Sequence, residues 1–316
     1  MATTSSPAIS VRPLRESELD IADGVCREAF NTFVGVPDLF GDLDYVHTRW
    51  RAAPNHAIAA EVDGAFAGSN FITCWGSFGF FGPLSVRPEL WDRGIAKGLM
   101  ETTVDLLESV GVSHSGLFTF GHSAKHLGLY QRFGFSPRFL TPILSRNVAA
   151  VPGENPAGWS RWSQLSEAGR AQALAACREI AGSLHDGLDL EREIQAVSMQ
   201  SLGDTILLQA DGLIGFAVCH TGKGTEAGSG SCYVKFGALR AGSSEADFDR
   251  LIYACDELAG ALGASRLELG VNTARHEAYR RLVQLGFRAG LIGVAMQRPN
   301  EPAWNRPGVY VVDDWR

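Results

Sequence analysis

The residues with the clearest chemical use form a short turn, Trp91-Asp92-Arg93-Gly94-Ile95-Ala96-Lys97. The apolar run at residues 80–86 before it has the length and composition of a buried strand. After it, apolar residues recur at helical spacing over residues 99–110. The free N–H groups of a small, glycine-containing first turn, together with the positive end of the helix dipole, favour a bound pyrophosphate. Pro83 has no N–H for a central ladder, so we expect the strand to splay there.

This stretch resembles motif A of the GNAT superfamily of N-acetyltransferases. In that family a strand ending near Leu-x-Val is followed by (Gln/Arg)-x-x-Gly-x-(Gly/Ala), which holds acetyl-CoA. Gly94 and Ala96 match the second and third key positions, whereas Trp91 stands where Gln or Arg is usual. The resemblance implies acetyl-CoA as cosubstrate, its pyrophosphate held by main-chain donors with Arg93 and Lys97. The predicted cofactor-binding residues are Leu84, Ser85, Val86, Trp91, Asp92, Arg93, Gly94, Ile95, Ala96 and Lys97, and no metal site is expected.

A second segment resembles the family's motif B, L-Y-x-x-x-G-F, as Leu129-Tyr130 and Gly134-Phe135. In the family that tyrosine often protonates the departing CoA thiolate, and the resemblance implies this role for Tyr130. A phenol with a pKa near 10 suits a proton donor at neutral pH. From the spacing alone, the commoner role of such a tyrosine is to pack a helix on the sheet, and motif A upstream is what favours the catalytic role. Ser123 stands where the family commonly has Asn.

The general base is not a carboxylate on the central strand, because residues 78–86 contain none. His122 and His126 have the right pKa range, although each is also typical of a solvated surface position. The tail at residues 310–316 carries two acids, and its docking would bring them toward the first half. We expect instead an edge strand with a solvated charged end. Tyr130 and His122 are therefore the predicted catalytic residues.

The acceptor pocket is expected between the aromatic segment at residues 31–40 and the neighbouring strands. Aromatic side chains there suit an apolar or aromatic amine, although a Phe-rich strand is also typical of a core. The predicted substrate-binding residues are Phe33, Trp75 and Phe78.

The order of expected elements starts again near residue 160. Strand-plus-turn segments end at Asp63-Gly64 and Asp211-Gly212, and helices end at Gly134-Phe135 and Gly286-Phe287. The offsets between the glycines, 148 and 152 residues, indicate an internal duplication.

With the resemblance, this predicts an α/β chain of two tandem GNAT-like domains, each a mixed, mostly antiparallel sheet flanked by helices. Residues 1–150 are predicted to bind acetyl-CoA and to be catalytic. Residues 151–316 are predicted to be a degenerate copy with an added C-terminal strand. In that copy Glu245 and Asp247 would repel a pyrophosphate, and Leu282 replaces Tyr130.

Composition limits the partners. The 316 residues are 45% hydrophobic and 20% charged with a net charge of −7, typical of a soluble globular protein without a nucleic-acid partner. Neither a signal peptide nor an apolar run of membrane-spanning length is found, and six cysteines are scattered without CxxC spacing. We therefore expect a cytoplasmic protein whose partner is a small-molecule amine; the sequence leaves a homodimer open.

The function favoured by these features is direct transfer of an acetyl group from acetyl-CoA to a primary amine of a small molecule. A covalent acyl-enzyme is disfavoured, because Cys74 has no adjacent His or helix start to lower its pKa. Two alternatives stay open: a protein N-acetyltransferase, and a non-catalytic acyl-CoA-binding or interaction module. Trp91 and the missing carboxylate favour the latter.

Overall fold

A computed structural model describes residues 8–148 and 158–316 of the chain. The expected boundary at residues 150 and 151 lies outside the described residues. The first half contains β1 (Ile9–Pro13), α1 (Leu19–Val34), α2 (Val46–Ala52), β2 (Ala57–Val62), β3 (Ala65–Trp75), β4 (Phe78–Phe81), β5 (Ser85–Val86), α3 (Ile95–Ser109), β6 (His114–Thr119), α4 (Ala124–Gln131) and β7 (Ser136–Asn147).

The second half repeats this order of elements, as the nearly equal offsets predict. It contains β8 (Trp159–Arg161), α5 (Glu167–Leu184), α6 (Glu191–Met199), β9 (Gly203–Ala210), β10 (Gly212–Gly222), β11 (Gly228–Leu239), α7 (Glu245–Ala261), β12 (Arg266–Gly270), α8 (His276–Gln284), β13 (Arg288–Arg298) and β14 (Val311–Val312).

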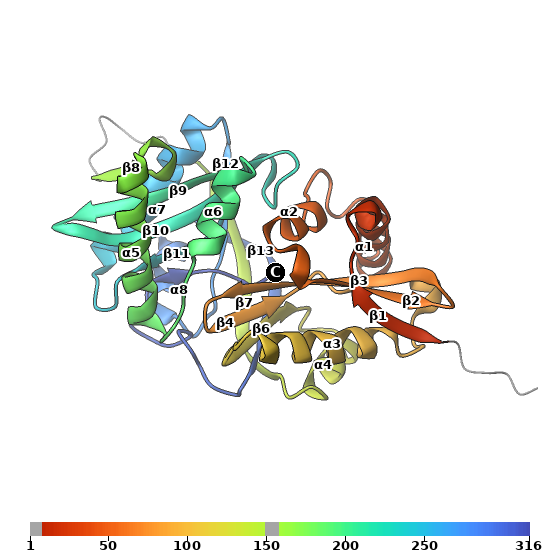
Figure 1. Cartoon of the computed structure of the whole chain (residues 1–316). Coiled ribbons are helices and arrows are strands. Elements are labelled where there is room, and N and C mark those ends of the chain that lie inside the picture. The colour runs from red at the N-terminus through yellow and green to blue at the C-terminus, as the bar shows by residue number, and fades with distance from the viewer. Residues whose placement is uncertain (1–7, 149–157) are drawn as a thin grey trace, which may run out of the picture.

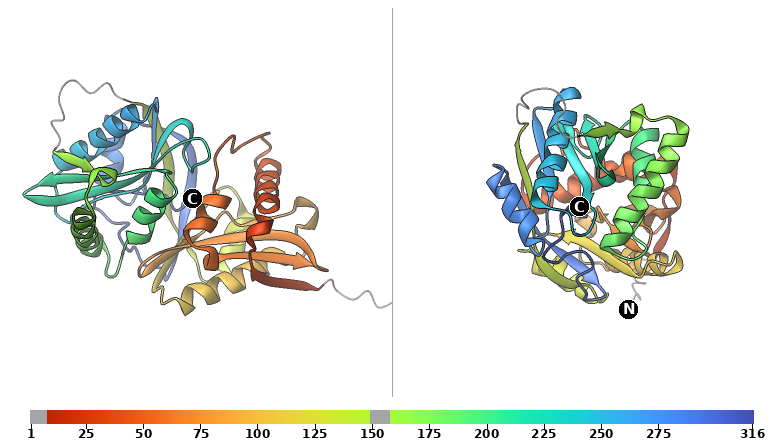
Figure 2. Two further views of the ribbon diagram at one scale, coloured as in Figure 1. Left: turned by 45° about the horizontal axis from the view of Figure 1, so that its top comes forward. Right: turned by 90° about the vertical axis from the view of Figure 1, so that its left-hand side faces the viewer.

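Within the described residues the strands form one 14-stranded sheet with the order β1-β2-β3-β4-β6-β13-β7-β12-β11-β10-β9-β8. Pairing is parallel between β4 and β6 and between β11 and β12, and antiparallel elsewhere. The expected mixed, mostly antiparallel sheet with flanking helices is therefore confirmed. In the first half, α1 and α2 cover one face and α3 and α4 the other (Figure 1). In the second half, α5 and α6 lie opposite α7 and α8 (Figure 2).

The two halves exchange their last long strands. β13 of the second half lies between β6 and β7, and β7 of the first half lies between β13 and β12. Val294 is opposite Thr119, and Leu267 is opposite Arg146. The division into residues 1–150 and 151–316 follows the order of the chain and stays a prediction. In space, one strand of each half is inserted into the part of the sheet formed by the other half.

The strand before the glycine turn splays at Pro83, as expected. β4 pairs with β6 as far as Phe80, opposite Gly116, and then leaves it. After Pro83, β5 pairs with β3 alone, with Ser85 opposite Ser69. Because proline donates no main-chain hydrogen bond, the ladder is interrupted there and a gap opens between β5 and β6.

The expectation of a solvated C-terminal end is wrong. β14 pairs with β11, and Asp313, Asp314 and Trp315 after it are all buried. Asp313 forms an ion pair of 2.5 Å with the buried Arg275. This pairing compensates the cost of removing the carboxylate from water. The tail thus ends in the middle of the molecule, between the two halves (Figures 1 and 2).

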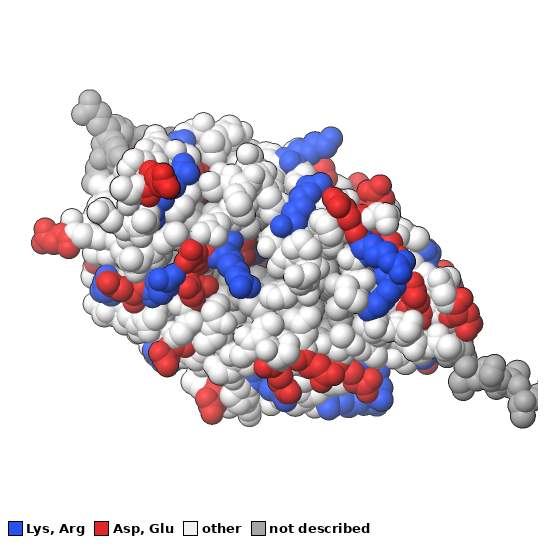
Figure 3. Space-filling model, in the orientation of Figure 1, with Lys and Arg blue, Asp and Glu red and all other residues white. Residues whose placement is uncertain are grey.

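The surface carries mixed charge. On the face shown in Figure 3, Lys and Arg side chains are interspersed with Asp and Glu. No helix in the described part of the chain combines the length and hydropathy needed to cross a bilayer.

Candidate active site

The turn before α3 leaves main-chain donors available. Gly94 is its N-cap with φ of +87°, and Asp92 also has a positive φ of +65°. The first helical hydrogen bond runs from Gly98 N to Gly94 O at 3.1 Å. No described residue accepts a hydrogen bond from the N–H groups of residues 95–97. A Cβ atom at Gly94 would meet nothing within 4 Å, so the space before these donors is open, as a pyrophosphate requires.

Cations surround this turn in surface ion pairs. Lys97 Nζ lies 3.0 Å from Glu101, and both side chains are exposed. Lys125 at the start of α4 lies 2.7 Å from Asp92 Oδ1 and 5.6 Å from the centre of the Trp91 ring. Exposed pairs of this kind are weak, so both lysines can turn to a phosphate. Sequence reasoning missed Lys125, because only the fold brings α4 to the turn.

Trp91, which departs from the family pattern, has a structural contact instead. Its Nε1 donates a hydrogen bond of 2.8 Å to Val86 O at the end of β5. The indole therefore ties the turn to the strand that precedes it.

A main-chain donor also lies at the gap beside β5. Gly82 N donates to Phe71 O at 2.8 Å, and Pro83 has no N–H. The next N–H, that of Leu84, has no acceptor among the described residues. It is therefore available to polarise a carbonyl oxygen placed between β5 and β6.

Tyr130 lies in the same hydrophobic cluster as the expected cofactor residues Leu84, Val86, Trp91 and Ala96. It is 8% exposed, and its ring centre lies 5.9 Å from that of Phe81. Burial raises its pKa to about 12, and its hydroxyl forms no hydrogen bond with a described residue. The phenol thus keeps its proton at neutral pH. Packing on the sheet and proton donation are compatible for this side chain.

An aromatic cluster joins the end of α1 to the start of α4. Phe33 lies 4.6 Å from His126 and 6.0 Å from His122, measured between ring centres, and 5.2 Å from Phe120. His122 is exposed, whereas His126 is half-buried one helical turn before Tyr130, on the same face. Burial, followed by Lys125 and His122, lowers the pKa of His126. A neutral imidazole there can accept a proton.

Trp75 and Phe78 do not lie near Phe33. They are 1% and 0% exposed, and the ring centre of Phe78 lies 4.5 Å from that of Trp304 and 4.8 Å from that of Trp315. Both belong to a core that includes residues of the second half. Because the C-terminal tail covers them, an acceptor has no access to either ring. Sequence reasoning placed these aromatics in strands correctly, but it could not foresee that the C-terminal tail packs over them.

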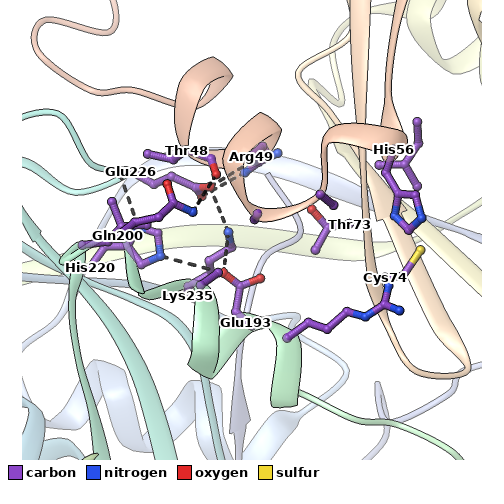
Figure 4. A pocket seen from close by; sticks show the side chains of 16 residues that line it. Thr48, Arg49, His56, Thr73, Cys74, Glu193, Gln200, His220, Glu226 and Lys235 are labelled. Carbon is purple, nitrogen blue, oxygen red and sulfur yellow. Dashed lines mark hydrogen bonds and ion pairs between the residues drawn. The ribbon is translucent and has the colours of Figure 1, made fainter. Parts of the chain in front are cut away.

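A pocket opens between the halves, on the α2 side of β3 (Figure 4). Its cavity volume is only about 30 Å³. Its floor is a buried charge network: Arg49 is paired with Glu226, and Lys235 lies 2.9 Å from Glu226 and 3.0 Å from Glu193.

The electrostatics of the floor keep its acids ionised. Burial alone would raise the pKa of Glu193, but Lys235 and His220 outweigh it and lower the pKa to about 2. Arg49 and Lys235 likewise overcome burial and hold the pKa of Glu226 well below its ordinary value. Burial raises the pKa of Cys74, on the pocket wall, to about 11. This side chain is therefore a thiol, not a thiolate.

The corresponding helix start in the second half is closed by its own side chains. Asp247 N donates to Ser244 Oγ at 3.1 Å, and Ser244 N donates to Asp247 Oδ2 at 3.2 Å. This capping box occupies the Asp247 N–H of α7 and places acids where a phosphate would lie.

Comparison with known proteins identifies a family for part of the chain. Residues 25–135 match the model of the acetyltransferase (GNAT) family. The first half of the chain contains a GNAT domain. No curated protein matches the chain.

Solved structures extend the GNAT likeness to the whole chain. A putative acetyltransferase from Pyrococcus horikoshii has a TM-score of 0.67 and 14% identity, over 97% of this chain and 95% of its own. A GCN5-related N-acetyltransferase from Sphaerobacter thermophilus has a TM-score of 0.62 and 13% identity, over 92% and 95%. The glucosamine N-acetyltransferase region of a fungal β-N-acetylglucosaminidase has a TM-score of 0.61 and 10% identity, over 93% and 38%. At such identities the likeness shows a shared fold.

Proposed function

We propose that the protein is an acetyl-CoA-dependent N-acetyltransferase that transfers acetyl directly to a primary amine of a small molecule. The observation that carries the proposal is the open turn before α3, whose donors adjoin the cluster containing both Leu84 and Tyr130. Acetyl-CoA, as donor substrate, supplies the thioester that the amine attacks and the thiol that leaves.

Each proposed role belongs to a group with a suitable environment. The N–H groups of residues 94–97 and the cations around them bind the pyrophosphate. Leu84 N–H donates to the thioester oxygen, where negative charge grows during attack. Tyr130 gives its proton to the sulfur as the C–S bond breaks, and bulk water restores it.

The amine must lose a proton before or during attack, and the aromatic cluster around Phe33 offers two acceptors. His122 is the exposed candidate, and His126 the half-buried one with a lowered pKa. The ring of Phe33 between them suits an apolar or aromatic amine.

A non-catalytic acyl-CoA-binding module is the second candidate. It is favoured by Trp91, whose contact with Val86 is structural, and by the absence of a carboxylate in residues 78–86. Such a module would bind acetyl-CoA at the same turn.

One experiment separates the two. Acetyl-CoA binding is measured by titration calorimetry, and thiol release is then followed with a panel of aromatic, aliphatic and sugar amines, including glucosamine. The proposal expects one binding site per chain and turnover with at least one amine. Tight binding without thiol release across the panel would favour the module.

The cellular setting is also part of the proposal. We infer a cytoplasmic enzyme that acts on a small-molecule amine, without nucleic acid or membrane, from the composition and the mixed surface charge. Light scattering on the purified chain would decide between a monomer and a homodimer.

A further inference from the structure

Arg49 on α2 links the two halves at the place where β4 and β5 splay. Its side chain is buried, and its Nη1 donates a hydrogen bond of 2.6 Å to Gly82 O. On its other side, Nε and Nη2 contact Oε1 and Oε2 of Glu226, both at 2.9 Å. Nη2 also donates to the main-chain oxygen of Arg316. This bidentate pairing fixes the plane of the guanidinium and thus the direction of Nη1.

Glu226 is itself held rigidly. It lies between β10 and β11 of the second half, where Lys235 Nζ donates to its Oε1 at 2.9 Å. Its main-chain N–H donates to His220 Nδ1 at 3.4 Å (Figure 4). Lys235 in turn contacts Glu193, and all four side chains are buried. Arg49 therefore rests on a charge network supplied by the second half.

Gly82 is held by hydrogen bonds on both sides, one from its N–H and one to its C=O. Gly82 N donates to Phe71 O of β3, and Gly82 O accepts from Arg49. Pro83 follows, whose ring limits the backbone to a narrow range of φ. The next N–H is that of Leu84, so its direction depends on how residue 82 is held.

We propose that Glu226 and Arg49 are positioning residues that aim the Leu84 N–H at the thioester oxygen of bound acetyl-CoA. The second half, which lacks a phosphate-binding turn, is then part of the active site through Glu226. This inference rests on the proposed binding of acetyl-CoA between β5 and β6. It does not require turnover.

The test compares affinity for acetyl-CoA with affinity for free CoA, which has no thioester oxygen. One main-chain hydrogen bond should make acetyl-CoA bind about 2- to 10-fold more tightly than CoA in the wild-type protein. Arg49→Lys keeps the positive charge but loses the planar guanidinium that pairs with both oxygens of Glu226. Glu226→Gln loses the negative charge that aligns this guanidinium. In both variants the ratio should fall toward one while the affinity for CoA changes little. Turnover, where an amine substrate is known, should fall about 10²-fold.

Controls separate positioning from general damage. Asp256→Asn removes a comparable buried ion pair, with Arg146, in the second half, and should leave both the ratio and turnover unchanged. Glu226→Asp, which keeps the charge but shortens the side chain, serves if Glu226→Gln does not fold. The double variant of Arg49 and Glu226 should lose no more than either single variant, because the two act as a unit.

The outcomes distinguish this inference from the proposed function. A folded Arg49→Lys protein with an unchanged ratio would overturn the positioning role, even if the wild type is an active enzyme. A wild type that binds acetyl-CoA and CoA equally would also overturn it. If the ratio shifts as expected but no amine is acetylated, the positioning role stands and the proposed enzyme activity fails. Absence of any acetyl-CoA binding would refute both.

Discussion

Replacing Tyr130 by Phe tests the proposed proton donor with minimal disturbance. The substitution keeps the ring that packs 5.9 Å from Phe81 and removes only the hydroxyl. That hydroxyl has no hydrogen-bond partner among the described residues, so its loss breaks no internal bond. The free energy of unfolding should change by less than about 1 kcal/mol, which corresponds to a Tm shift below about 4 °C.

The effect on the reaction should be much larger. A positioned general acid contributes typically about 10²–10⁴-fold, or roughly 3–5 kcal/mol of activation free energy. Because the phenol acts on the leaving sulfur and not on the bound ground state, kcat should fall while the Kd for acetyl-CoA stays nearly constant. Burial raises the pKa of Tyr130 to about 12, so its loss by ionisation should not reduce wild-type kcat below about pH 11.

The assay measures kcat, acetyl-CoA affinity and Tm on the same preparation. Tyr310→Phe is the matched control. Tyr310 stacks on Phe248 in the second half, away from the turn before α3, and loss of its hydroxyl should not change kcat. Unimpaired turnover in folded Tyr130→Phe would mean that water protonates the thiolate, and the catalytic role of Tyr130 would be wrong.

Four further outcomes are expected. Gly94→Glu should abolish acetyl-CoA binding in calorimetry, because it places a carboxylate before the α3 donors. Gly242→Glu in the second half is the matched control, since Gly242 has a φ of +86° against +87° for Gly94 and the same open space, and it should leave binding intact. Loss of binding in both variants would contradict a single site. Burial holds the pKa of His126 below 6.5, so if His126 is the base, kcat should stay constant above pH 6.5 and fall as the imidazole is protonated at lower pH. His126→Gln should remove this pH dependence. A pH profile of the variant that matches the wild type would exclude the role. Residues 1–150 alone should be poorly soluble, since β6 would lose β13; a stable, active monomer in light scattering would refute this. Cys74→Ser should keep kcat within about twofold, because the half-buried thiol has a raised pKa and is not ionised at neutral pH, and a loss of acyl transfer would revive a covalent route.

Local features of the fold were predictable from the sequence because they depend on short-range rules. The turn at Gly94, the splay at Pro83 and the repeated order of elements follow from glycine and proline chemistry and from hydrophobic periodicity. The exchange of β7 and β13 was not predictable, because an apolar strand pattern does not specify its neighbour.

Features that depend on distant contacts were missed for the same reason. Arg49 and Glu226 are 177 positions apart, and Glu226 lies in a glycine-rich stretch that suggests only a loop. Trp75 faces the second half rather than a pocket, and alternation along a strand does not reveal what covers each face. The acidic tail looked solvated because the buried Arg275 that pairs with Asp313 lies elsewhere in the chain.

The second half combines an acidic helix start with a network of buried charges. Its α7 start is capped by Ser244 and Asp247, which occupies the Asp247 N–H and places a carboxylate at the helix start. Yet it keeps Glu193, Glu226 and Lys235 buried at the junction, although burying charges is unfavourable unless each is paired. The pairing is complete only with Arg49 of the first half, whose Nη1 donates to Gly82 O beside the splayed strand. Removing Glu226 would leave the buried guanidinium of Arg49 beside Gly82 without its carboxylate partner. The integrity of the junction and the geometry at Leu84 therefore depend on the same ion pair.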